Sequence, residues 1–111
     1  MQAAVDRLLE EQPDLRGIYL TTYNAAVLCA HLKKRGMGGK IAVVGQDLYP
    51  ELAECLRDGS LAATLFQNQQ FQGRRAVEML LDSLTNPQVP IRSEYVAPQL
   101  VMLSNLECFS Y

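Results

Sequence analysis

The sequence predicts an α/β fold in which a parallel sheet forms the middle of three layers and helices cover both of its faces. Three observations lead to this prediction. Short apolar, β-prone segments alternate along the chain with amphipathic segments of helical period. Prolines and glycines stand between these segments, where elements end. The chain has 111 residues, of which 49% are hydrophobic and 20% charged, enough for one folded domain and too apolar for a mainly disordered chain.

The first half of the chain shows the alternation clearly. Residues 1–12 have apolar side chains at helical spacing, and Pro13 then pushes the residue before it out of the helical region. Residues 17–20 are short, apolar and β-prone, as a buried strand should be. Two threonines follow, whose hydroxyls are expected to cap a helix over about 23–35. The glycines at 36–39 end that helix.

The second half continues the same pattern. Residues 40–45 form the clearest strand, and Pro50 opens the next helix at a first-turn position where proline is tolerated. A third strand is predicted at 61–66 and a long helix at about 69–83. The tail from 91 to 106 has an extended pattern. The crossovers between parallel strands are expected to be right-handed.

Charge and cysteine content exclude several classes of protein. The chain has 10 Lys and Arg against 12 Asp and Glu, so it lacks the strong positive field of a nucleic-acid binder. Its apolar runs are far shorter than the roughly 20 residues of a membrane span, and Asp6 and Arg7 argue against a signal peptide. The three cysteines and the single histidine lack the spacing of a zinc site, so we expect no metal and no cofactor. Free thiols favour a reducing compartment, the cytoplasm.

Four polar residues follow the ends of predicted strands, where ligands bind in open parallel sheets. They are Thr22, Asn24, Asp47 and Gln67. A carboxylate accepts two hydroxyl hydrogen bonds, and an amide both donates and accepts, so this set suits a polyhydroxylated ligand. Asp47 and Gln67 have a second interpretation, since each could cap the helix that follows it. The residues alone leave both interpretations open.

The sequence contains no recognisable catalytic set, and we expect a protein that is not an enzyme. Asp47 is the only acid among the strand-end segments, so no carboxylate pair is evident. The serines lack the GxSxG pattern of a nucleophile. The glycines at 36–39 precede a strand instead of opening a helix, which indicates a turn and not a phosphate loop. His31 is expected to lie on a helix face and not to act as a base.

An ordered series of short motifs resembles the C-terminal part of the type I periplasmic-binding-protein fold. That fold occurs in sugar-binding transport proteins and in the ligand-sensing domains of LacI-type transcriptional regulators. The motifs extend over nearly the whole chain: PDLRGIY at 13–19, KIAVVGQD at 40–47, RDG at 57–59, ATLFQ at 63–67, QG at 72–73 and SNL at 104–106.

The resemblance implies a ligand held between two α/β lobes. Asp47 matches the acid that takes sugar hydroxyls, and Gln67 matches a glutamine near the hinge that touches the ligand. Two departures stand out: residues 22–24 read TYN where the family has an Asn-Asp pair, and Gln46 replaces a common aromatic. These departures argue against a standard pentose or hexose pocket.

The resemblance also implies that residues 1–111 are an incomplete, C-terminal part of an effector-binding domain, in which about 69–98 pack on an N-terminal lobe outside this sequence. The predicted helix at 69–83 and its end carry an apolar stripe that would then lack its partner. We therefore expect a homodimer, or exchange of this helix between chains. The stripe consists of Val77, Leu80, Leu81 and Leu84.

The function implied first is the effector-sensing portion of a bacterial LacI-type regulator in the cytoplasm, with a small carbohydrate-like effector. Such a regulator contacts DNA through a separate N-terminal module, and no membrane partner is expected. The alternative is a sugar-binding protein of a transport system with the same fold. An α/β enzyme is a third class, because fold does not fix function.

Overall fold

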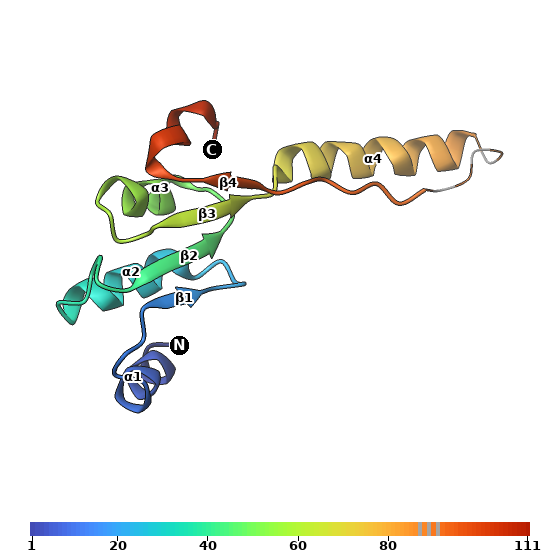
Figure 1. Cartoon of the computed structure of the whole chain (residues 1–111). Helices are drawn as coiled ribbons and strands as arrows, with labels where there is room; N and C mark the ends of the chain where they lie inside the picture. The colour runs from blue at the N-terminus through green and yellow to red at the C-terminus, as the bar shows by residue number, and fades with distance from the viewer. Residues whose placement is uncertain (87, 89, 91) are drawn as a thin grey trace. The chain divides into compact units, whose positions relative to one another are not determined.

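A computed structural model describes residues 1–86, 88, 90 and 92–111. The chain forms two compact units, unit 1 (Met1–Phe66 with Gln99–Tyr111) and unit 2 (Gln67–Pro98). The elements, shown in Figure 1, are α1 (Gln2–Glu11), β1 (Gly17–Tyr19), α2 (Ala25–Lys34), β2 (Ala42–Gln46), α3 (Pro50–Arg57), β3 (Ala63–Phe66), α4 (Gln69–Thr85), β4 (Gln99–Val101) and a 3-10 helix, η1 (Leu103–Cys108).

Unit 1 is built on one sheet with strand order β1-β2-β3-β4. The first three strands are parallel, with Ile18 beside Val43 and Gly45 beside Thr64. The α/β class and the mainly parallel sheet are therefore confirmed. β4 differs from the prediction, because it runs antiparallel to β3.

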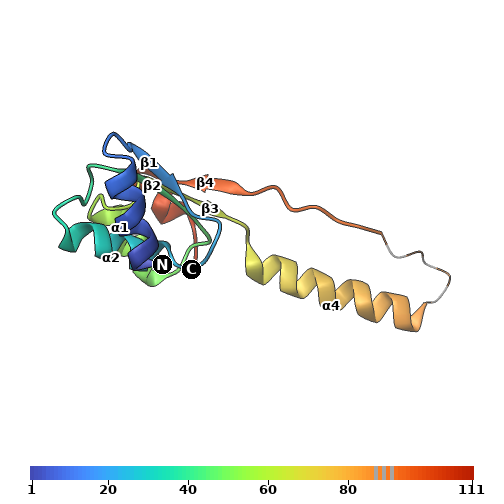
Figure 2. The same ribbon diagram turned by 90° about the horizontal axis from the view of Figure 1, so that it is seen from below.

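The helices of unit 1 lie on one face of the sheet, which differs from the expected cover on both faces. Figure 2 shows α1, α2 and α3 on the same side of the strands. Burial in β2 agrees, since Val43 and Gly45 are buried whereas Ala42 is exposed. The reason is topological. The strands β1, β2 and β3 are neighbours in chain order, so both right-handed crossovers advance in one direction and put α2 and α3 on the same face.

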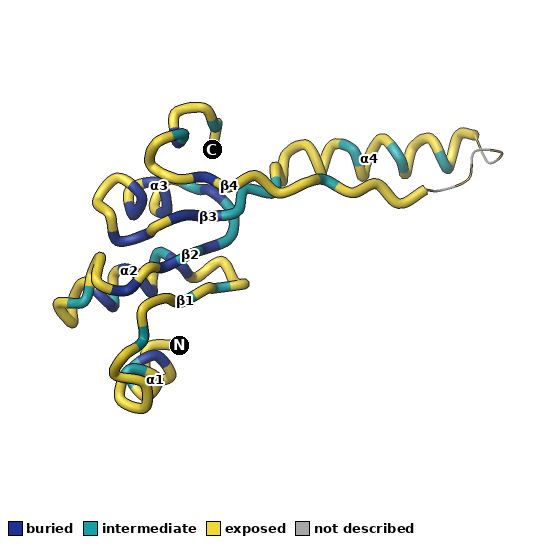
Figure 3. Tube along the Cα trace, viewed as in Figure 1, coloured by how far each residue is buried: buried dark blue, intermediate teal, exposed yellow. Residues whose placement is uncertain are grey.

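An apolar core of unit 1 lies between this face and the helices, and its residues are among the dark segments of Figure 3. Close approach of α2 to β2 depends on Gly45, because a Cβ there would lie 2.9 Å from the Cβ of Ala25. The predicted apolar sides of α2 and α3 are confirmed as buried. The core includes Leu28, Cys29, Leu32, Val43, Leu52, Cys55, Leu56, Val101 and Leu106.

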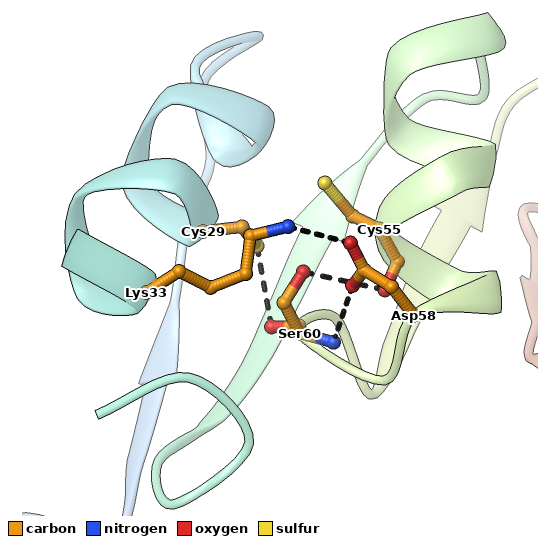
Figure 4. Close-up of polar contacts among 5 residues, drawn as sticks. All are labelled: Cys29, Lys33, Cys55, Asp58 and Ser60. Carbon is orange, nitrogen blue, oxygen red and sulfur yellow. Dashed lines mark hydrogen bonds and ion pairs between the residues drawn. The ribbon is translucent and has the colours of Figure 1, made fainter. Parts of the chain in front are cut away.

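The junction of α2 and α3 combines buried thiols with an exposed ion pair (Figure 4). Lys33 Nζ lies 2.6 Å from Asp58 Oδ2, and this cation lowers the pKa of the Asp58 carboxyl to about 2. The Ser60 amide donates to Asp58 Oδ1 (2.9 Å), while the Cys29 thiol donates to the Ser60 carbonyl (3.3 Å). Burial, together with the nearby Cys55, raises the pKa of the Cys29 thiol to about 12. Cys29 therefore stays protonated and packs as a small apolar residue.

Local signals predicted most element ends within a few residues, with two exceptions. The N-cap of α2 is Asn24 and has no side-chain cap bond, so the expected threonine caps are wrong. The tail is extended only in part, because Leu103–Cys108 forms η1; position 91, where the extended pattern begins, lies outside the described residues. The turn after α2 is confirmed: Gly36 has φ +68°, and the Met37 amide donates to the Leu32 carbonyl at 2.9 Å.

Unit 2 consists of α4 and the segment that returns toward β4. The Asn68 side chain caps α4 by accepting a bond from the Phe71 amide, and none of the described residues of α4 is buried. Arg75 pairs with Glu94 of the returning segment and with Glu78. The four residues of the apolar stripe are 58–72% exposed. Unit 2 nearly coincides with the segment 69–98 assigned above to another lobe, and what it packs on stays a prediction.

Candidate ligand-binding site

The carboxyl ends of β1, β2 and β3 meet at one edge of the sheet, here called the carboxyl edge. The strands are parallel and in register, with Tyr19 beside Val44 and Gln46 beside Leu65. The predicted site residues follow these ends: Thr22 and Asn24 follow β1, Asp47 follows β2, and Gln67 follows β3.

Asp47 has a backbone conformation that is unusual for a residue other than glycine. Its φ of +69° lies in the left-handed region, which costs a non-glycine residue about 1 kcal/mol and which aspartate tolerates better than most residues. Two hydrogen bonds hold it there. Its amide donates to the Leu65 carbonyl (2.8 Å), and its carbonyl accepts from the buried Thr64 hydroxyl (2.6 Å). The sheet thus fixes a half-buried acid directly beyond the end of β2.

Thr22 and Asn24 are exposed in the turn between β1 and α2. Asn24 is the N-cap of α2 through its backbone, whose carbonyl accepts from Leu28 N (3.1 Å). Between them stands Tyr23, whose ring stacks on that of Tyr49 with centroids 4.2 Å apart and planes at 24°. Tyr49 Oη also donates to the Tyr23 carbonyl at 2.8 Å. The stack joins the turn of Thr22 and Asn24 to the loop that carries Asp47.

Sequence reasoning missed these two tyrosines. Tyr23 stands beside Thr22 in the segment that follows β1, which was the available signal, whereas Tyr49 is the N-cap of α3, just before Pro50. A second contact ties the same strands, since Gln46 Nε2 donates to Tyr19 Oη at 2.9 Å.

Gln67 follows Phe66 directly and is the first residue of unit 2. It is half-buried, and within unit 2 it lines a cavity of about 380 Å³ with Gln72, Arg75 and other residues. The N-cap of α4 is Asn68 and that of α3 is Tyr49. The interpretation of Asp47 and Gln67 as N-caps is therefore wrong, while their binding role stays a prediction.

The carboxyl edge of unit 1 offers one carboxylate, a hydroxyl, amides and aromatic rings. This combination can accept and donate hydrogen bonds to a neutral polar molecule. Among the described residues there is no group of three His, Cys, Asp or Glu side chains placed to hold a metal ion. In the same part of the chain, no helix combines the length and apolar character needed to cross a bilayer.

The sequence matches the family model described as periplasmic binding protein domain over residues 1–88. The chain belongs to this family. No curated protein is a significant match to the sequence.

Solved structures agree with the family assignment. A solute-binding protein of an ABC transporter from Burkholderia graminis C4D1M, in complex with D-arabinose, has a TM-score of 0.87 at 20% identity over 99% of this chain and 39% of its own. A Caulobacter myo-inositol binding protein with bound myo-inositol has a TM-score of 0.86 at 23% identity, covering 98% and 38%.

A candidate LacI transcriptional regulator from Bacteroides fragilis is equally similar, with a TM-score of 0.84 at 19% identity over 98% of this chain and 38% of its own. At such identities the likeness establishes the fold. The chain spans about two fifths of the length of these structures.

Proposed function

We propose that this chain forms one wall of a carbohydrate-binding site, as the effector-sensing portion of a LacI-type transcriptional regulator. The binding proposal rests on the backbone conformation and position of Asp47. Its strained backbone is held by two hydrogen bonds at the carboxyl edge, and such strain persists where the surrounding structure enforces it, often at ligand sites.

The surrounding residue types support a polyhydroxylated ligand. Thr22 and Asn24 add a hydroxyl and an amide group, which donate and accept hydrogen bonds without demanding a charged partner. Relatives of the same fold hold D-arabinose and myo-inositol in their crystal structures. We propose binding without catalysis, since the strand ends offer no acid–base pair.

The cysteines favour the regulator and a cytoplasmic location. Cys29, Cys55 and Cys108 are free thiols, and free thiols persist in reducing compartments. DNA contact would belong to a separate module, because the chain has a net charge of −2. The alternative, a sugar-binding protein of a transport system, is favoured by the ABC-transporter binding proteins among the similar structures. The upstream coding sequence discriminates between them: a helix-turn-helix supports the regulator, and a signal peptide supports the transport protein.

Substitution of Asp47 tests the binding site. The 111-residue chain is titrated into the millimolar range with D-arabinose, D-galactose and myo-inositol while saturation transfer to the ligand protons is recorded by NMR. Asp47→Asn removes a charged acceptor and should weaken binding by about 2 kcal/mol, roughly thirtyfold. Asp14→Asn is the matched control, because Asp14 is exposed and precedes β1, at the opposite edge of the sheet. Equal affinities of Asp47→Asn and the unaltered chain would remove Asp47 from the site.

A further inference from the structure

The C-terminal tail of unit 1, residues 109–111, contacts the last residue of β3. The Phe109 ring meets the Phe66 ring edge-on, with centroids 5.3 Å apart and planes at 74°. Both rings are half-buried and pack against the apolar core. Phe66 ends β3, where it pairs with Gln99 of β4. The tail therefore packs on the strand at the point where the chain leaves the sheet.

Further contacts hold the tail in this position. The helix η1 packs on α3 and β4, as Figure 1 shows, and its Leu106 is 1% exposed. The Phe109 amide donates to the Leu106 carbonyl at 3.1 Å, which ties the backbone of Phe109 to η1. Beyond Phe109, Arg57 Nη2 at the end of α3 donates to Tyr111 Oη at 2.8 Å. Phe109 is thus held from both directions along the chain.

The end of β3 also holds Asp47 in its left-handed conformation. The Leu65 carbonyl accepts a bond from the Asp47 amide (2.8 Å), and the Thr64 hydroxyl donates to the Asp47 carbonyl (2.6 Å). These two residues directly precede Phe66, the residue that Phe109 contacts. A strained backbone persists only where its surroundings enforce it. A shift of this strand end therefore releases Asp47 from its positive φ.

We propose that Phe109 is a positioning residue, which braces the end of β3 and thereby keeps Asp47 in its binding conformation. Phe109 acts through Phe66 and the strand, and not by contact with the ligand. Arg57 supports the brace by fixing the chain beyond Phe109. The consequence for binding rests on the proposed carbohydrate-binding function, whereas the bracing of β3 does not.

Hydrogen exchange recorded by NMR tests the brace without any ligand. The Asp47 amide, just beyond β2, reports on the end of β3. The Ala42 amide, at the start of β2, donates to the Arg16 carbonyl (2.9 Å) and is the internal reference. Phe109→Ala should speed exchange of the Asp47 amide roughly two- to tenfold, the range for one aromatic pair, and that of Ala42 less than about twofold. Phe109→Leu keeps apolar bulk and should show the same pattern with a smaller change.

The two amides separate positioning from a loss of overall stability, because global unfolding opens both ends of β2. Leu103→Ala removes a 57% exposed side chain of η1 and should leave both exchange rates unchanged. Equal acceleration at Asp47 and Ala42 in Phe109→Ala, or no acceleration at Asp47, overturns the inference. If Phe109→Ala does not fold, the same two amides in Phe109→Leu decide.

Saturation-transfer NMR with D-arabinose, D-galactose and myo-inositol tests the consequence for binding. Phe109→Ala should weaken the binding of these probes by roughly the factor by which it speeds Asp47 exchange, two- to tenfold. Unchanged affinity beside faster Asp47 exchange overturns the positioning role. Absence of binding by the unaltered chain overturns the proposed function instead, and the exchange rates then decide by themselves whether Phe109 braces β3.

Discussion

Units 1 and 2 have similar apolar periodicity and very different burial. In unit 1, the stripe of α2 is fully used: Leu28 and Leu32 are at most 1% exposed. In unit 2, the stripe of α4 has the same spacing, yet Leu80 and Leu84 are 60% and 72% exposed. The spacing of apolar residues therefore determines which side of a helix is apolar. Whether that side is buried depends on other elements that can pack against it. None of the described residues covers the apolar stripe of α4.

The largest expected difference between the units is in core stability. Leu52→Ala removes a side chain that is fully buried in unit 1 and should lower the free energy of unfolding by about 2–5 kcal/mol. The matched change Leu80→Ala in α4 should cost less than about 0.5 kcal/mol, because the side chain is exposed. Urea denaturation followed by circular dichroism measures both. Equal losses would mean that the stripe of α4 is buried in solution.

Self-association is the next largest effect. The exposed stripe of α4 predicts that the chain dimerises at micromolar concentration, and Leu84→Glu should weaken the dimer about tenfold or more by placing a charge in the apolar contact. Multi-angle light scattering over a concentration series gives the answer. Val27→Glu, at a 47% exposed position of unit 1, is the control and should leave association unchanged. A monomer at every concentration contradicts the prediction.

Acid should destabilise unit 1 through Asp58. The pKa of this carboxyl is about 2 in the folded chain, chiefly because of Lys33, against 3.8 for the free group. Its contribution is therefore present above about pH 3.8 and is lost as the pH falls toward 2. The Asp58 side chain is 41% exposed, so solvent screening keeps the effect below about 1 kcal/mol.

The measurement is the unfolding midpoint of the unaltered chain and of Asp58→Asn between about pH 5 and pH 2. The unfolding midpoint of Asp58→Asn should fall less steeply with decreasing pH than that of the unaltered chain, whereas the midpoint of Asp14→Asn should follow the unaltered chain. Identical slopes for Asp58→Asn and the unaltered chain would mean that the Lys33 pair does not persist in solution.

The smallest effect belongs to unit 2. Arg75 and Glu94 join α4 to the returning segment, and both side chains are over a third exposed. Glu94→Gln should hardly change the free energy of unfolding, because the ion pair is exposed, and should speed hydrogen exchange of the α4 amides without changing that of unit 1. Glu10→Gln, an exposed change on α1, should leave the exchange of α4 as it is. Faster exchange across unit 1 in Glu94→Gln would show that the two units unfold together.

Local features of the sequence account for much of this fold. The run at 40–45 and Pro50 predicted β2 and the start of α3, because β propensity and proline geometry act within a few residues. The direction of β4 could not be predicted, since it depends on Phe66 meeting Gln99, far along the chain. The one-sided placement of α2 and α3 follows from strand order, which no short window contains.

In the candidate site too, the residues marked by a local sequence pattern were predicted, and the contacts between distant residues were not. Asp47 was found because it follows an evident strand, and its position at the carboxyl edge needs no other information. The stack of Tyr23 on Tyr49 was missed, because it joins residues on two loops through a contact that leaves no periodic trace. The N-cap role of Asn68 was also missed, since Gln67 is an equally plausible polar neighbour in the sequence.

The chain leaves the sheet of unit 1 after Phe66 and re-enters it at Gln99, and these two residues are paired on neighbouring strands. Any segment that connects Phe66 to Gln99, whether a tight turn or a long helix with a returning strand, has to join the same two adjacent strand ends. Loop-closure entropy rises only slowly with the length of the inserted segment, by about 0.6 kcal/mol for each doubling. Unit 2 should therefore be replaceable by a short connection. A chain in which an Asn-Gly turn replaces it should retain the sheet and core of unit 1.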